Sequence, residues 1–258
     1  MLDNRLKSES SSQSFFQNID IFWLESIRQD YKLSQDVLSK ITAGYEALYH
    51  NLYKFKNTLT GILLPMHTKL FLESNMQNPM LIALLQNDLR WFIECRASQL
   101  LDRDTLKEFQ LLAALCGATD VTHYLTDKEE LKIDLDVLNM ALWSGQYTGP
   151  SLEYFTRLCA PTHDSLKYAI ASINENVVRE MLDIYHLKPS SDYLTVAAGT
   201  GNAAIFNLLI SHGVVPKGDL VFKIASLSEN QEIMHILERD FAYVGSGLGA
   251  SKNSQPKS

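Results

Sequence analysis

The stretch that decides the fold is YLTVAAGTGN at residues 193–202, followed by IFNLLI at 205–210 and SHG at 211–213. The first segment places small and apolar residues at helical spacing and ends in a Gly-Asn pair, which tolerates the left-handed backbone of a helix end. The second segment gathers apolar residues on one side of another helix. The stretch therefore predicts a short helix, a tight turn and a second helix.

This helix-turn-helix unit recurs along the chain every 28 residues. An alanine of the first helix marks the phase, and it is found at Ala113, Ala141, Ala169, Ala197 and Ala225. Other apolar positions repeat in step with it, three residues before the alanine and eight and twelve residues after it. They are Leu138, Leu166, Leu194 and Phe222 in the first helices, and Val121, Leu125, Val177, Met181, Ile205, Leu209, Ile233 and Leu237 in the second. Because neither helix can bury its apolar side alone, consecutive units are expected to stack.

Polar residues predict where the helices begin and end. A carboxylate five positions before the alanine would accept the free amides of a first helical turn, and this slot holds Asp136, Asp164 and Asp192. The slot that would end the first helix with a left-handed residue holds Gly117, Gly145, Gly201, Asn174 and Asn230. Residues 146–150 look like an insertion in the third unit, whose second helix is therefore expected to be shifted.

The stretch at 193–213 resembles the TPLHLAAxxGH opening, the VVxLLL segment and the closing glycine of ankyrin repeats. The segment NPMLIAL at 78–84, with Asn87-Asp88 as its turn, is similar to the same opening and adds a unit before Ala113. The resemblance implies an all-α solenoid of about six ankyrin-like helix-turn-helix repeats, over about two thirds of the chain. Ankyrin units usually run 33 residues, so we expect the β-hairpin fingers to be reduced to turns. Tetratricopeptide repeats, whose unit is 34 residues, are the competing two-helix solenoid.

The remaining sequence divides the chain into four regions. They are a flexible arm at 1–15, an N-terminal helical cap domain at 16–75, the repeat domain at 76–244 and a disordered tail at 245–258. The cap is expected to cover the apolar flank of the first unit, although partner binding by its helices is also open. The tail resembles the C-terminal export signals of type IV secretion effectors, and a frayed end without function has the same small, polar composition.

Composition narrows the class of protein. The 258 residues carry a net charge of −7, with 22 acidic against 13 basic side chains between residues 74 and 244, which disfavours nucleic acid as a partner. The three cysteines lack a CxxC spacing, and the N-terminus lacks the layout of a signal peptide. No apolar run approaches the ~18 residues of a membrane span. We therefore expect a cytoplasmic protein without a membrane span.

The sequence shows no convincing catalytic or metal-binding group. Cys159 and His163 lie four residues apart, but a zinc site needs four ligands. Cys116 and His123 share a unit, yet no third group is evident to orient the imidazole. We expect no enzyme activity, cofactor, metal or small-molecule substrate. Loss of an activity on Cys116→Ser would be needed to reopen the enzyme hypothesis.

In the ankyrin family, partners rest on the concave face made by the first helices. The resemblance assigns this face to Leu85, Gln86, Leu115, Cys116, Trp143, Ser144, Ser172, Thr200, Leu227 and Ser228. The alternative is that these positions are part of the core. The leading hypothesis is a protein-protein interaction module, with a secreted bacterial effector acting on a host protein, in the host cytoplasm, as one candidate role. The second hypothesis is a structural or chaperone-like adaptor subunit of a larger assembly, such as a secretion machine.

Overall fold

The structure is a computed structural model that describes residues 66–228 and 230–241. The predicted arm, the predicted tail and the cap domain up to residue 65 lie outside the described residues. Within them the chain forms thirteen α-helices and no β-strand. The helices are α4 (Met66–Asn75), α5 (Pro79–Leu85), α6 (Leu89–Ala97), α7 (Arg103–Cys116), α8 (Thr119–Asp127), α9 (Leu135–Ser144), α10 (Pro150–Leu158), α11 (Ser165–Ala171), α12 (Glu175–Asp183), α13 (Ser191–Thr200), α14 (Ala203–Ser211), α15 (Leu220–Leu227) and α16 (Gln231–Phe241).

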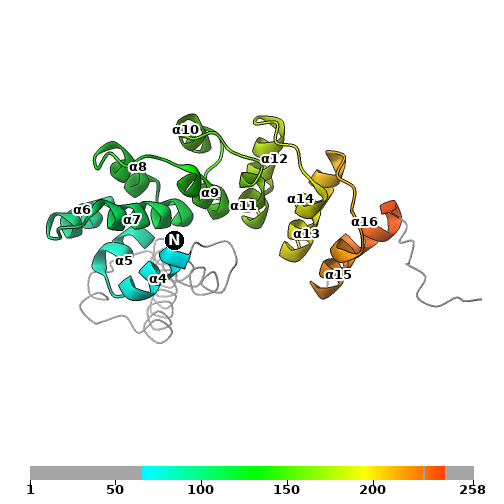
Figure 1. The fold of residues 1–258 in the computed structure, drawn as a ribbon, viewed down its shortest axis with the longest axis horizontal. Coiled ribbons are helices and arrows are strands. Elements are labelled where there is room, and N and C mark those ends of the chain that lie inside the picture. The colour runs from blue at the N-terminus through cyan, green and yellow to red at the C-terminus, as the bar shows by residue number, and fades with distance from the viewer. Residues whose placement is uncertain (1–65, 229, 242–258) are drawn as a thin grey trace, which may run out of the picture. The chain divides into compact units, whose positions relative to one another are not determined.

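The helices form two compact units, one ending at Ser172 and the other beginning at Ile173. In the first unit α5 packs on α7, α7 on α9 and α9 on α11, while α6 packs on α8. In the second unit α13 packs on α15, α12 on α14 and α14 on α16 (Figure 1). Within each unit, therefore, first helices pack on first helices and second helices on second helices, as stacked helix pairs require.

The repeat alanines are fully buried, both the five at 28-residue spacing and Ala83 of the first unit, thirty residues before Ala113. Ala83, Ala113, Ala141, Ala169, Ala197 and Ala225 each have an exposed fraction of 0%. The same holds for the predicted apolar positions of the second helices, namely Val121, Leu125, Val177, Met181, Ile205, Leu209, Ile233 and Leu237. A single methyl group lets neighbouring helices approach closely, and each buried aliphatic side chain contributes about 1.5–3 kcal/mol from its removal from water.

Helix α4, the last part of the region predicted to cap the repeats, packs on α7. The ring of Phe71 meets that of Phe109 edge-on at 5.1 Å, and Phe109 in turn meets Phe92 of α6 at 6.0 Å. Phe92 also contacts Tyr124 of α8 at 6.2 Å. Edge-to-face aromatic pairs of this kind add about 0.5–1.5 kcal/mol each beyond the burial of their area. Aromatic packing therefore links α4 to the first two helix pairs.

Of the three predicted N-caps, Asp164 alone is at the N-cap position, and its carboxylate pairs with Lys167 and makes no capping hydrogen bond. Asp164 precedes α11, but α9 and α13 begin two residues earlier than expected, so Asp136 and Asp192 lie in the first turn instead. The cap of α9 is Asp134, whose carboxylate accepts the amide of Val137 at 3.1 Å. The N-cap position two residues upstream is Asp134 in α9 and Ser190 in α13, and of these only Asp134 makes a side-chain capping hydrogen bond.

The predicted left-handed helix ends are correct at the glycines and wrong at the asparagines. Gly117, Gly145 and Gly201 take φ values of 71°, 68° and 68°. Asn174 instead has an extended backbone and caps the start of α12, while the preceding Ile173 takes the left-handed conformation with φ of 63°. The side-chain oxygen of asparagine accepts a free amide at a helix start, and Asn174 therefore stands at the N-cap of α12 and not at the end of α11.

The third pair has the predicted shifted second helix. Helices α6, α8, α12, α14 and α16 begin six residues after the repeat alanine, whereas α10 begins nine residues after it. The insertion contributes a residue to the core. Tyr147 is 1% exposed, and the centroid of its ring lies 4.6 Å from that of Phe155. Burial raises the pKa of the Tyr147 hydroxyl. The insertion therefore adds an aromatic side chain to the core.

Candidate protein-binding surface

The ten residues assigned to a binding face do not form one exposed trough. Leu85, Leu115, Cys116 and Ser144 are buried, with exposed fractions of 2%, 0%, 6% and 8%. Gln86, Trp143, Ser172, Thr200 and Ser228 are half-buried, and Leu227 is 78% exposed. The four buried residues therefore belong to the core, which was the alternative considered for these positions. They cannot contact a partner unless the surrounding helices repack.

The burial of Leu115 and Cys116 follows from the length and neighbours of α7. This helix has 14 residues, the longest of the described helices, and its eight residues from Phe109 to Cys116 are all buried. It packs against α4, α5, α8 and α9, so helices cover it on several sides. The 28-residue pattern could not reveal this, because α4 is not part of the repeat.

The hydroxyl residues of the predicted face have a local role that the sequence analysis missed. Each stands three residues after a repeat alanine and donates a hydrogen bond to that alanine's carbonyl. The donors are Ser144 at 2.6 Å, Ser172 at 2.6 Å, Thr200 at 2.8 Å and Ser228 at 2.9 Å. These bonds add a hydroxyl donor to carbonyls at the end of a helix, where amide partners are scarce, although the Ala169 carbonyl also accepts the amide of Ser172 at 3.3 Å. A Ser or Thr in this slot therefore indicates a helix end, and partner binding is not needed to explain it.

Trp143 and Tyr168 form the most promising pair for binding in the first unit. Trp143 lies on α9 and Tyr168 on α11, and their rings meet at 6.4 Å with an interplanar angle of 64°. Both side chains are half-buried, so part of each ring is accessible. Burial raises the pKa of the Tyr168 hydroxyl, and the carboxylates of Asp136 and Asp164 raise it further. An aromatic pair thus stands beside two acidic side chains.

These acidic side chains differ in how far they are already neutralised. The carboxylate of Asp164 pairs with Lys167 at 2.9 Å, which is the main reason that its pKa is lowered. Asp136 is exposed in the first turn of α9. Aromatic faces attract cations and carboxylates pair with them, so this corner favours a basic side chain of a partner.

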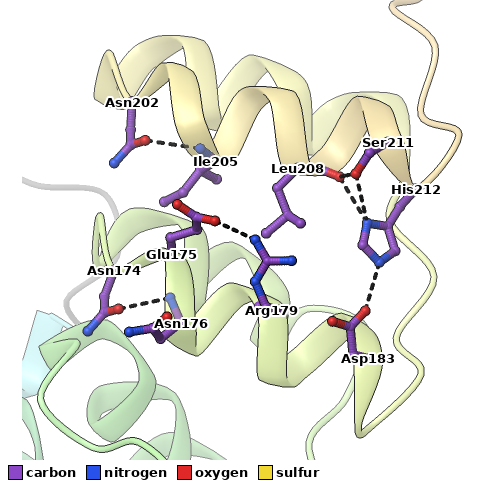
Figure 2. A network of polar contacts seen from close by, with 10 residues as sticks. All are labelled: Asn174, Glu175, Asn176, Arg179, Asp183, Asn202, Ile205, Leu208, Ser211 and His212. Atoms are coloured by element: carbon purple, nitrogen blue, oxygen red, sulfur yellow. Dashed lines mark hydrogen bonds and ion pairs between the residues drawn. The ribbon is translucent and has the colours of Figure 1, made fainter.

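In the second unit one polar contact, between His212 and Asp183, joins the second helices α14 and α12 (Figure 2). The imidazole of His212, at the end of α14, reaches the carbonyl of Leu208 with Nδ1 at 2.9 Å and Asp183 of α12 with Nε2 at 3.0 Å. Both partners are acceptors, so the geometry favours an imidazole that carries both protons. The Leu208 carbonyl and the Asp183 carboxylate raise the pKa of His212 accordingly.

Asparagines make a second set of contacts between neighbouring turns of this unit. The Oδ1 atoms of Asn202 and Asn230 accept the amides of Ile205 and Ile233 at 3.0 and 2.9 Å, which caps their own helices. Their Nδ2 atoms donate to the carbonyls of the left-handed residues one repeat earlier, Ile173 at 3.3 Å and Gly201 at 2.6 Å. We call this the asparagine ladder. Each rung joins two consecutive turns.

The residues weighed for catalysis are found in structural settings. Cys116 is buried, and the ring of His123 packs against that of Tyr154 at 4.1 Å. Within residues 66–228 and 230–241, no group of three or more His, Cys, Asp or Glu side chains is placed to hold a metal ion. None of the helices described is long and apolar enough to cross a bilayer.

Comparison with known proteins does not assign the chain to a family. No protein-family model, curated protein or solved structure matches the chain.

Proposed function

We propose that this protein is an interaction module built of ankyrin-like helix pairs, and that it binds a partner protein through the accessible edge of α9 and α11. The repeat phase, the fully buried alanines and the pairing of first helices with first helices support the ankyrin-like solenoid. The five connections from a second helix to the next first helix have five to eight residues and no strand, in keeping with reduced fingers.

A single observation carries the binding proposal. Trp143 and Tyr168 keep part of their rings accessible beside the acidic Asp136 and Asp164. A half-exposed tryptophan is costly to leave in water, and tryptophan and tyrosine are enriched among the residues that dominate binding energy. The partner is expected to be a protein or peptide that presents apolar residues and at least one lysine or arginine, because the chain is acidic.

Affinity capture with matched variants tests this function. The intact chain, Trp143→Ala and Tyr168→Ala are used as baits in lysates of the native cell and of a candidate host cell, with quantitative mass spectrometry. Trp91→Ala is the control, because Trp91 is also half-buried but lies on α6, a second helix. We expect one partner to be lost with both α9–α11 variants and kept with the control.

Other outcomes separate the competing functions. A partner retained by all variants would contradict binding at the α9–α11 edge and favour the adaptor hypothesis, especially if the complex forms in the native cell before any host is met. A large fall in the melting temperature of Trp143→Ala would show that this side chain stabilises the core instead. The predicted effector role and type IV export rest on residues 245–258, and secretion of a chain with and without that tail would test them.

A further inference from the structure

The last helix pair, α15 and α16, forms a groove that the proposed function does not use. Its volume is about 520 Å³. Phe222, Leu227 and Met234 provide its apolar lining, and Asp219, Lys223 and Glu238 are its charged residues. Leu227 is 78% exposed and the neighbouring Leu220 is 57% exposed. Large aliphatic side chains are rarely left this accessible in a cluster unless another surface covers them.

The repeat identifies what kind of surface covers these positions elsewhere in the same unit. Twenty-eight residues upstream, Leu194 corresponds to Phe222, Ala198 to Ser226 and Phe206 to Met234. All three upstream residues have an exposed fraction of 0%, and they belong to α13 and α14, on which α15 and α16 pack. The equivalent positions of α15 and α16 are half-buried or exposed. In this architecture the natural cover for such a face is a helix.

The groove is not simply a polar end to the stack. Terminal repeats usually replace the apolar face by polar residues to remain soluble. Here Ser226 and Glu238 replace an alanine and an isoleucine of the previous pair, but Phe222 and Met234 remain large and apolar. The face therefore combines apolar positions with a few charges, as surfaces that bind an amphipathic helix do.

Charge favours a basic occupant. Residues 173–241 hold nine acidic and five basic side chains, and Asp219 and Glu238 outnumber Lys223 at the groove itself. The carboxylate of Glu238 is 61% exposed and lies 3.9 Å from His235, a distance that leaves it able to accept another cation. The same charges disfavour a second copy of this acidic chain as the occupant of the groove.

We propose that the α15–α16 groove binds a basic amphipathic α-helix of another protein. Apolar residues of that helix, spaced at i, i+4 and i+7, fill the groove against Phe222, Leu227 and Met234, and flanking lysines or arginines face Glu238 and Asp219. This site is separate from the α9–α11 edge, so either site can fail without the other.

Two stapled helical peptides of about 15 residues serve as probes, since short free helices are marginal in water. They share one leucine stripe at i, i+4 and i+7, and their flanking residues are lysine in one and glutamate in the other. Fluorescence anisotropy with the full chain measures binding. The lysine peptide is expected to bind at least about tenfold more tightly than the glutamate peptide, and Glu238→Lys is expected to narrow this preference.

Leu227→Asp tests the apolar contact, with Leu100→Asp as its control. Leu100 is fully exposed in the first unit, so both variants add the same negative charge to an accessible leucine and neither removes a core residue. We expect Leu227→Asp to lower the affinity for the lysine peptide at least about tenfold, because a central apolar contact is lost. Leu100→Asp is expected to leave this affinity unchanged. Because added negative charge alone would favour a basic peptide, weaker binding would isolate the loss of the apolar contact.

Several results would overturn the proposal. One is equal binding of the lysine peptide to the intact chain and Leu227→Asp, or equal binding of the two peptides. Another is a dimer in sedimentation that dissociates with Leu227→Asp, since the occupant would then be a second copy. A third uses a photo-crosslinking residue at position 227. Attachment to residues 242–258 of the same chain would make that segment the occupant, whereas attachment to the lysine peptide supports the proposal.

Discussion

At the residue scale, Ile173 departs from the rest of the repeat in residue type, because a branched side chain stands in a left-handed slot. Its slot, four residues after the repeat alanine, holds glycine in three other pairs, and Ile173 takes the same left-handed backbone with φ of 63°. A branched Cβ makes this conformation unfavourable by about 1–2 kcal/mol. The side chain is 54% exposed and recovers little of that free energy by packing.

Replacing Ile173 should therefore stabilise the protein. Asparagine tolerates the left-handed backbone and keeps a side chain, so Ile173→Asn is expected to raise the free energy of unfolding by about 1 kcal/mol in urea denaturation. Val215→Asn is the matched control, a branched residue that is 58% exposed and does not have a positive φ. A gain of equal size in both variants would show that removal of an exposed apolar side chain, and not backbone strain, is responsible.

Single residues also show what the sequence could and could not predict. The alanine spacing placed five buried alanines of the first helices correctly, because burial follows the helical period directly. The capping residues were harder, since Asp134 and Asp136 are equally able to cap and only the backbone geometry decides between them. Leu115 was assigned to a surface and is buried, because α4 and α5 pack on its helix and no repeat pattern encodes such a neighbour.

At the element scale, the ends of α12 and α14 are joined through His212 and Asp183. A partly exposed ion pair of this kind is worth little by itself, but His212 also satisfies a carbonyl at the end of its own helix. The raised pKa links this contact to pH. The charged groups that act on the imidazole are Asp183, which favours its protonated form, and Arg179, which opposes it.

The sign of the pH dependence follows from that raised pKa. The folded protein holds the proton of His212 more tightly than the unfolded chain, whose histidine has a pKa of 6.5, so the contact stabilises fully below 6.5 and its contribution is lost as the pH rises through the folded value. Asp183→Asn should therefore lower the melting temperature more at about pH 6 than at about pH 9.

A second carboxylate provides the control for that experiment. Glu238 lies 3.9 Å from His235, both side chains are largely exposed, and Glu238→Gln makes the same chemical change. Its effect on the melting temperature is expected to be small and independent of pH. A difference between wild type and Asp183→Asn that stays constant from acid to alkaline pH would contradict a charged His212.

The elements themselves were largely predictable from the sequence. Helix pairs, their order and the shift of α10 follow from the periodic apolar residues and the insertion at 146–150. The role of that insertion was not predictable, since nothing in its composition marks Tyr147 as a core residue. The Trp143–Tyr168 contact was half anticipated, because the pattern singled out Trp143 but gave no information about which side chain of α11 it meets.

At the scale of the whole molecule, two compact units meet between Ser172 and Ile173 in the chain, although the 28-residue period runs through both. Periodicity in sequence reports the local fold of each pair, whereas compact units depend on how many contacts each pair makes with its neighbours. The division therefore lay beyond the sequence pattern. We therefore expect that the two units can open separately.

A substitution inside the second unit tests that independence. Ala197 has an exposed fraction of 0% on α13, which packs on α15, so Ala197→Leu should overpack this contact and cost about 1–3 kcal/mol. Hydrogen exchange with mass spectrometry should show faster exchange across residues 191–241 and unchanged exchange across α7 to α10. Equal acceleration in both regions would mean that the described residues open as one cooperative unit.

The asparagine ladder has a consequence for how such a chain can grow. Each rung joins a helix start to the turn of the preceding helix pair, so it depends on how the helices of the two pairs are aligned. Duplication of one complete repeat would preserve every rung, whereas a gain or loss of two or three residues inside a helix would break the rungs on both sides. Changes of length are thus tolerated in whole repeats or in the loops that follow the second helices. The third pair, which like the first two has no asparagine in this slot, is where a short insertion became part of the core.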